Sequence, residues 1–256
     1  MVIIGSGNVA ESLARTAKEQ GVAVEQVFAR NEVRGRMVAQ IAGADWCGDV
    51  RNVARSDIYL IAVSDGAVAD VAATLPFADD AVVAHTAGSV GLEALPARVT
   101  HRAVFYPFMT FTAGRAVDWR SVPVFVEASD EVALERITLL ARRLSDRVAQ
   151  ADTAQRARLH LAGVFANNFA NAMFAAAGDV LHEAGLPADL TDALIGETAA
   201  KAIASHNPAT VQTGPAVRGD KATQERHRTL LAEDALLRTI YDKISEYIWQ
   251  KRISKS

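Results

Sequence analysis

The hydrophobic positions of the chain follow two patterns, one in each half of the sequence. In the first half, short apolar runs alternate with longer stretches whose apolar residues recur at helical spacing. The short runs predict strands at residues 2–5, 24–29, 58–63, 81–86, 103–108 and 122–128. Strands that alternate with helices are typical of parallel βαβ units. Because several runs are apolar on both faces, as in a sheet covered on both sides, we predict a doubly wound α/β domain.

The pattern changes near residue 152, after which alanine-rich helical segments dominate and no strand-like run is present. Helices are predicted over 153–185, 187–206 and 220–250, with a long polar loop at 206–220. The expected fold is therefore a Rossmann-type domain, residues 1–151, followed by an all-helical domain, residues 152–256.

Composition narrows the classes of partner. The net charge of −3 gives no reason to expect nucleic acid or an anionic membrane as a partner. Cys47 is the only cysteine, so no disulfide can form within the chain and a reducing compartment is expected. No run reaches the ~18 apolar residues of a membrane span. We therefore expect a cytoplasmic protein.

A glycine-rich turn joins the first strand to the first helix. Its residues are Gly5, Ser6, Gly7, Asn8, Val9 and Ala10, a G-x-G-x-x-A pattern. The first glycine permits a tight turn, and the second lets the backbone approach a pyrophosphate at the helix N-terminus. The position between strand and helix predicts a dinucleotide site, and a purely structural turn is the alternative. The strand starts at the second residue, which leaves open whether residues precede it.

The end of the second strand indicates which nucleotide binds. NAD sites usually carry an acidic residue there, whereas this chain has Arg30 and Asn31. An arginine can bind a 2′-phosphate with two hydrogen bonds, so NADP is predicted, unless this is only a solvated basic loop. Val63 and Ser64 end another strand and are expected to line the same crevice. His85 ends the next strand, where it is either a proton donor or a hydrogen-bonding brace.

A polar stripe is predicted on the first helix of the second half. At 100° per residue, His160, Asn167 and Asn171 lie within roughly 40° of one another, and Asn168 flanks them. The opposite face is apolar, so the helix is expected to be buried. Buried amides left unpaired cost about 1–3 kcal/mol each, so these side chains need partners. The partners are either neighbouring helices or a substrate.

A second polar candidate is the segment "TGPAVRGD". Gly214 and Pro215 predict a rigid turn, and Arg218 can bind a substrate carboxylate or phosphate. Asp220 is expected either to cap the next helix or to take part in chemistry.

Seven motifs spread over the chain carry a resemblance to a known family. They are "VIIGSGNVAESLA", "FARN", "AVSD", "HTAGS", "YPFMTF", "HLAGVFANNFANAM" and "TGPAVRGD". Together they resemble the Rossmann-like NADP oxidoreductases with a C-terminal domain of unknown function 2520. That family is similar in fold to 6-phosphogluconate dehydrogenase, the β-hydroxyacid dehydrogenases, ketopantoate reductase and pyrroline-5-carboxylate reductase. The resemblance implies a homodimer formed through the helical domain and a substrate held between the domains.

The resemblance also exposes a departure at the catalytic position. In the β-hydroxyacid dehydrogenases a helix carries a catalytic lysine and, four residues later, an asparagine. The corresponding pair here is Asn167 and Asn171, and an amide cannot donate and accept the proton of that reaction. His160 is the nearest titratable group on that face. Tyr106 stands where many relatives have histidine and is expected to contribute a phenol to substrate binding.

Two functions follow. The first is an NADP(H)-dependent oxidoreductase that reduces a carbonyl or imine of a small polar substrate. An imine substrate needs the lysine less, because an iminium carbon accepts hydride without a strong acid nearby. His160 or His85 would handle the proton, and the asparagines would orient the substrate. The second is a non-catalytic NADP(H)-binding or sensing protein. A deazaflavin cofactor occurs in relatives of this fold, but no residue here selects it.

Overall fold

The computed structural model describes residues 1–253, which belong to two compact units, Met1–Asn168 and Phe169–Ser256. The predicted division at 151/152 follows the last strand of the first unit. That unit also includes the next helix, so the division between domains stays a prediction. Within the described residues, no helix combines the length and the apolar character needed to cross a membrane.

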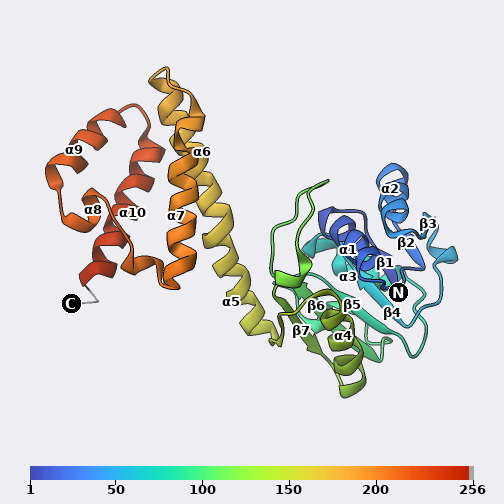
Figure 1. Ribbon diagram of the computed structural model, residues 1–256. Helices are drawn as coiled ribbons and strands as arrows, with labels where there is room; N and C mark the ends of the chain where they lie inside the picture. Colours follow the sequence, from blue (N-terminus) through green and yellow to red (C-terminus); the bar gives the residue numbers. More distant parts are fainter. Residues whose placement is uncertain (254–256) are drawn as a thin grey trace. The chain divides into compact units, whose positions relative to one another are not determined.

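The first unit contains one eight-stranded sheet (Figure 1). Its strands are β1 (Val2–Ile4), β2 (Gln26–Phe28), β3 (Asp45–Cys47), β4 (Ile58–Ile61), β5 (Val82–His85), β6 (His101–Pro107), β7 (Val124–Ala128) and β8 (Val148–Gln150). The order is β3-β2-β1-β4-β5-β6-β7-β8. The first six strands are parallel, β7 is antiparallel to β6, and β8 is parallel to β7. The order 3-2-1-4-5-6 is that of dinucleotide-binding domains, so the predicted fold class is confirmed.

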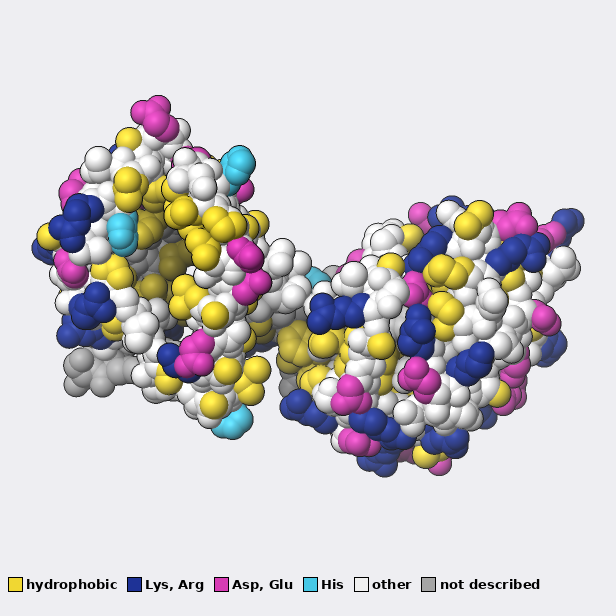
Figure 2. Space-filling view, turned by 45° about the horizontal axis from the view of Figure 1, so that its top comes forward, with side chains coloured by type: hydrophobic (Ala, Val, Ile, Leu, Met, Phe, Trp, Pro, Cys, Tyr) yellow, Lys and Arg dark blue, Asp and Glu magenta, His cyan; other side chains and the backbone are white. Residues whose placement is uncertain are grey.

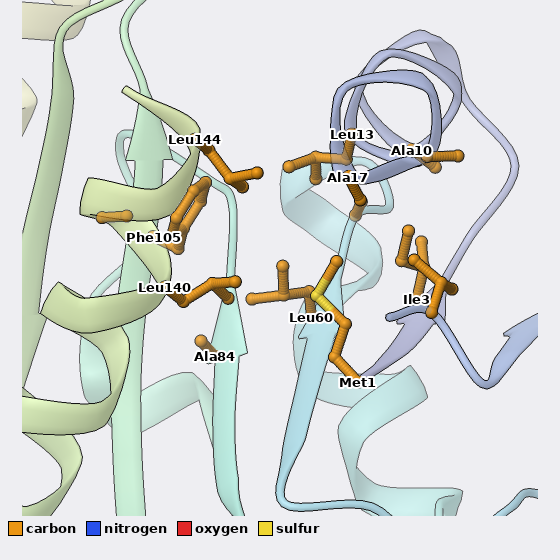
Figure 3. Packing of buried hydrophobic residues seen from close by; sticks show 14 of the residues in the cluster. Met1, Ile3, Ala10, Leu13, Ala17, Leu60, Ala84, Phe105, Leu140 and Leu144 are labelled. Atoms are coloured by element: carbon orange, nitrogen blue, oxygen red, sulfur yellow. The ribbon is translucent and has the colours of Figure 1, made fainter. Parts of the chain in front are cut away.

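Helices cover both faces of this sheet. Helices α1 (Asn8–Glu19), α2 (Glu32–Ala42) and α4 (Glu131–Leu144) pack on one face, and α3 (Val68–Thr74) packs on the other. Side chains alternate between the faces: Ile3 joins the first cluster, whereas Val2 and Ile4 join the second. Figure 3 shows Ile3 and Leu60 of the sheet packed with Leu13 of α1. The strands are apolar on both faces because both faces are covered.

After β8 the regular elements of the described chain are helices. They are α5 (Thr153–Gly163), a π-helical segment (Val164–Phe169), α6 (Ala170–Glu183), α7 (Asp192–Ser205), α8 (Pro215–Arg218), α9 (Lys221–Leu230) and α10 (Ala235–Ile253). A capping box between Asp152 and Gln155 starts α5. No strand follows β8 in the described residues, as predicted. The segment predicted as one helix over 220–250 is divided into α9 and α10, and α8 lies within the predicted polar loop.

Candidate functional site

The glycine-rich turn brings the backbone close to strand β4. Gly5 has φ +123°, a conformation that favours glycine, and its N–H donates to the carbonyl of Phe28 at 2.8 Å. A Cβ at this position would lie 2.2 Å from the carbonyl oxygen of Ala62. The position therefore admits only glycine, as the fingerprint motif requires.

The N-terminus of α1 faces open space. Gly7 is its N-cap, and no side chain caps the first turn. A Cβ on Gly7 would have no atom within 4 Å. The first N–H groups and the helix dipole therefore point into a space where an anion can be bound.

A crevice of about 990 Å³ lies in front of this turn. Its lining includes every residue predicted to bind the nucleotide: Gly5, Ser6, Gly7, Asn8, Val9, Arg30, Asn31, Val63 and Ser64. The volume is near the upper end of the range for small-molecule sites. The structure thus brings the predicted nucleotide residues together in one unit.

Three arginines follow strand β2, and they differ in what they contact. Arg34 donates to Glu11 at 3.0 Å, and Arg36 donates to Glu32 at 2.8 Å and lies over the ring of Trp46. Arg30 is exposed and lines the crevice, and no hydrogen bond or ion pair engages its side chain within residues 1–253. Arg30 is therefore the arginine of the three that is available to a 2′-phosphate.

The loop after β6 forms a wall of the crevice that sequence reasoning did not assign. Met109, Thr110 and Phe111 line it. Asn8 Nδ2 donates to the Phe111 carbonyl at 3.0 Å, and the Gly114 N–H donates to the buried carboxylate of Glu11 at 2.8 Å. The loop is thereby attached to the glycine-rich turn and to α1. The only sequence signal for it is the motif "YPFMTF".

His85 is completely buried at the end of β5, and backbone groups engage both ring nitrogens. Nδ1 accepts from the Ala87 N–H at 3.3 Å, so Nε2 carries the hydrogen and donates to the Gly91 carbonyl at 3.3 Å. Burial lowers the pKa of His85 to about 4. This geometry favours the brace over the proton donor.

Tyr106 ends β6 and is half-buried beside the loop that follows β5. A Cβ on Gly88 would lie 2.6 Å from the Tyr106 ring, so the ring packs directly on this glycine. Its other neighbour is Phe108, with ring centroids 6.1 Å apart. Burial raises the pKa of the Tyr106 phenol, and the nearby charge of Asp65 raises it further.

Helix α5 passes against this aromatic group. A Cβ on Gly163 would lie 2.9 Å from Phe108. The π-helical segment with Asn167 and Asn168 begins at the next residue. The polar segment of the helix therefore starts beside Phe108, near the strand end that carries Tyr106.

The polar stripe differs from the prediction in two respects. His160, Asn167, Asn168 and Asn171 are exposed in the single chain, so the expected burial of this helix is wrong. The π-helical segment also turns through a smaller angle per residue than an α-helix, which rotates His160 away from Asn167. On the apolar face, Phe165 and Phe169 are 62% and 50% exposed, whereas Met173 and Ala176 line a hollow together with residues of α10.

A buried ion pair attaches the start of α5 to the sheet, and sequence reasoning missed it. Arg156 is fully buried and pairs with Glu127 of β7. It also donates to the carbonyls of Val90 at 2.7 Å and Ala151 at 3.3 Å. Arg156 thus connects α5, β7 and the loop after β5. A single arginine among apolar helix residues offers no sequence signal for such a role.

Arg218 lies in the second unit, exposed at the end of α8. Asp220 caps α9, because its side chain accepts from the Thr223 N–H at 3.0 Å. The capping alternative is therefore the one the structure supports for Asp220. Within the described residues, no group of three or more His, Cys, Asp or Glu side chains is placed to hold a metal ion.

The crevice fits NADP. It has a glycine whose missing side chain leaves room at a helix N-terminus, and an available arginine at the end of β2. When bound, NADPH supplies a hydride; the protein supplies binding and orientation.

Two family models match the chain. "NADP oxidoreductase coenzyme F420-dependent" matches residues 1–88, and "Domain of unknown function (DUF2520)" matches residues 122–248. No curated protein matches the sequence.

Solved structures extend the match to nearly the whole chain. A Bacteroides fragilis protein, provisionally described as an NADP oxidoreductase, is 37% identical, with 97% of each chain covered and a TM-score of 0.90. A Thermotoga maritima protein is 21% identical over 99% of this chain and 98% of its own, with a TM-score of 0.77. An imine reductase from Myxococcus stipitatus in complex with NADP+ shares the fold: 16% identity, 97% and 92% coverage and a TM-score of 0.67. The chain belongs to the family of NADP oxidoreductases in which a Rossmann-type domain precedes a domain of unknown function (DUF2520).

Proposed function

We propose that this protein is an NADPH-dependent reductase that acts on a carbonyl or imine of a small polar substrate. The observation that carries the proposal is the crevice, which combines the glycine-rich turn, an uncapped helix N-terminus and Arg30. These three features match the pyrophosphate and the 2′-phosphate of NADP.

The substrate side of the proposal rests on the asparagine-rich helix. Asn167, Asn168 and Asn171 are exposed amides that can bind polar groups of a substrate, and His160 and Arg218 are exposed charge or proton carriers. An imine is favoured over an alcohol–ketone pair because no lysine stands at position 167. The fold shared with an imine reductase agrees with this preference.

We also propose a homodimer formed through the helical unit. Leu190, Leu194 and Ile203 are 59%, 67% and 73% exposed there. The same unit has a hollow of about 510 Å³ lined largely by apolar side chains of α6 and α10, and Figure 2 shows hydrophobic side chains gathered around it. Apolar surface of this kind marks an interaction site. The buried, unpaired Cys47 and the NADP cofactor agree with a cytoplasmic location.

A second candidate, a protein that binds NADP(H) without turnover, is favoured by the asparagine at the lysine position. The two candidates differ in one measurement. A reductase transfers deuterium stereospecifically from [4-²H]NADPH to a carbonyl or cyclic imine, and a sensor transfers none.

The nucleotide site is tested by paired fluorescence titrations with NADPH and NADH. Loss of a charge-assisted hydrogen bond costs about 1.5–3 kcal/mol, so Arg30→Ala should weaken NADPH binding roughly 10- to 150-fold. NADH binding should change little. Arg36→Ala is the matched control, because Arg36 already pairs with Glu32. Equal affinity of the wild type for both nucleotides would contradict the proposal.

A further inference from the structure

Three side chains meet where β4, β5 and β6 end. Asp65 follows β4, Ser89 follows β5, and Tyr106 is the second-last residue of β6. The Ser89 hydroxyl donates to Asp65 Oδ2 at 2.7 Å. A Cβ on Gly88 would lie 2.9 Å from the Tyr106 hydroxyl, so any larger residue would displace the phenol. All of these residues belong to the first unit, and their arrangement does not depend on the second.

This group lies at the edge of the sheet where a dinucleotide places its reactive half. In the order 3-2-1-4-5-6, the strands β1 to β3 bind one mononucleotide and β4 to β6 bind the other. Arg30 and the glycine-rich turn belong to the first half. Two residues that line the crevice are close in sequence to this group. Ser64 directly precedes Asp65, and Met109 follows Tyr106 by three positions. Asp65 and Tyr106 are therefore close in sequence to residues that line the nicotinamide half of the crevice.

We propose that the Tyr106 hydroxyl donates the proton to the substrate heteroatom during reduction, and that Gly88 and Asp65 are positioning residues for it. The proposal rests on the proposed NADPH-dependent reduction. The substrate carbon gains a C–H bond from the hydride that leaves C4 of the nicotinamide, so NADPH is oxidised to NADP+. The π electron pair of the substrate's double bond moves to oxygen or nitrogen. The Tyr106 O–H bond breaks, and its proton binds that heteroatom. Water then returns a proton to the half-buried phenolate.

The charges around Tyr106 support a neutral donor. Burial raises the pKa of the phenol, Asp65 raises it further, and Arg156 opposes them. Tyr106 is therefore protonated throughout the neutral range. His85 cannot take the same role there, because burial lowers its pKa to about 4 and its one N–H is given to Gly91. His160 is exposed on α5 and has no comparable support.

The first test follows the phenol itself, independently of turnover. The chain has four tyrosines, so the ¹³Cζ signal of Tyr106 can be assigned as the one lost in Tyr106→Phe. Saturating NADPH should shift this signal, and Asp65→Asn should move its titration to lower pH. A Tyr106 signal that does not move while fluorescence shows bound NADPH would overturn the proposal.

The second test uses deuterium transfer from [4-²H]NADPH to a panel of carbonyls and cyclic imines. Tyr106→Phe should lower kcat about 10²- to 10⁴-fold and leave the affinity for NADPH unchanged. Gly88→Ala should also lower kcat, and it should shift the ¹³Cζ signal of Tyr106. Tyr247→Phe, on the exposed part of α10, is the matched control.

The outcomes separate the two proposals. Wild-type turnover that survives in Tyr106→Phe would remove the donor role and leave the reductase intact. Absence of transfer by the wild type to any member of the panel would remove the reductase, and the donor role with it. Wild-type kcat should fall only as the pH rises through the raised pKa of the phenol, whereas a histidine donor would give a fall near pH 6.5.

Discussion

The two units differ in how they bury their apolar residues. In the first unit, two clusters enclose the sheet, and residues such as Ile3, Leu13 and Leu60 have no exposed surface. In the second unit, Ala216 is the only hydrophobic residue of the described part that is buried. Leu194 and Ile203 of α7 remain 67% and 73% exposed. The first unit completes its own core, and the second presents apolar helices for another surface to cover.

This difference shows which polar side chains are held in place by contacts within a single chain. The first unit places its polar groups by internal contacts, as Gly88 does for Tyr106 and Glu11 for the Gly114 loop. The exposed amides of Asn167 and Asn168, in the π-helical segment, and of Asn171, in α6, have no such support among the described residues. Nucleotide binding is therefore the property of the first unit that a single copy can show, and substrate binding is expected to need the second unit in its assembled form.

The largest expected effect is on the stability of the proposed dimer, when charges are placed on the exposed apolar surface of the second unit. Leu190→Glu combined with Leu194→Glu removes two side chains whose burial is worth about 1.5–3 kcal/mol each. The dissociation constant of the dimer should therefore rise at least about 100-fold. Sedimentation velocity measures the change. Val33→Glu is the control, because Val33 is 81% exposed on α2 of the first unit. A wild type that stays monomeric at micromolar concentration would contradict the proposed dimer.

The next effect lies within the first unit. Arg156→Met leaves the carboxylate of Glu127 without its buried partner and should lower the free energy of unfolding by about 3–5 kcal/mol. Arg51→Met is the control, because the Arg51–Asp49 pair is at the surface and should contribute little to the free energy of unfolding. Urea denaturation compares the variants. Equal losses for the two would mean that Arg156 does not anchor α5.

The smallest effect is a pH dependence from His85. Its pKa is lowered to about 4 in the folded protein, so between pH 6.5 and 4 the unfolded chain binds more protons. Stability is therefore lost as the pH falls, by about 2 kcal/mol between pH 7 and pH 5. Urea denaturation of the wild type and of His85→Gln at pH 7 and pH 5 measures the contribution of His85 to this loss of stability. An unchanged slope in the variant would show that His85 is not buried in its neutral form.

Sequence patterns predicted the fold class because apolar runs and helical spacing are local properties. Strands β3 and β8 were missed because each has three residues, of which two are apolar, and neither belongs to a longer apolar run. The antiparallel direction of β7 was also missed, since direction depends on which strands pair and not on the run itself. The helix with Asn167 was predicted at the right position, but the π-helical segment and the exposure of the amides were not.

The sequence alone predicted which residues form the nucleotide site. Gly5, Gly7 and Arg30 are near one another along a single βαβ unit, and the conformational demands on glycine and the charge of arginine belong to each residue. The tertiary structure decided the rest, because long-range contacts have no local signal. It distinguished Arg30 from Arg34, it placed Tyr106 on Gly88, and it buried Arg156 between α5 and β7. The partners in these contacts, Arg34 with Glu11, Tyr106 with Gly88 and Arg156 with Glu127, are distant in sequence, and only packing of the sheet brings them within contact distance.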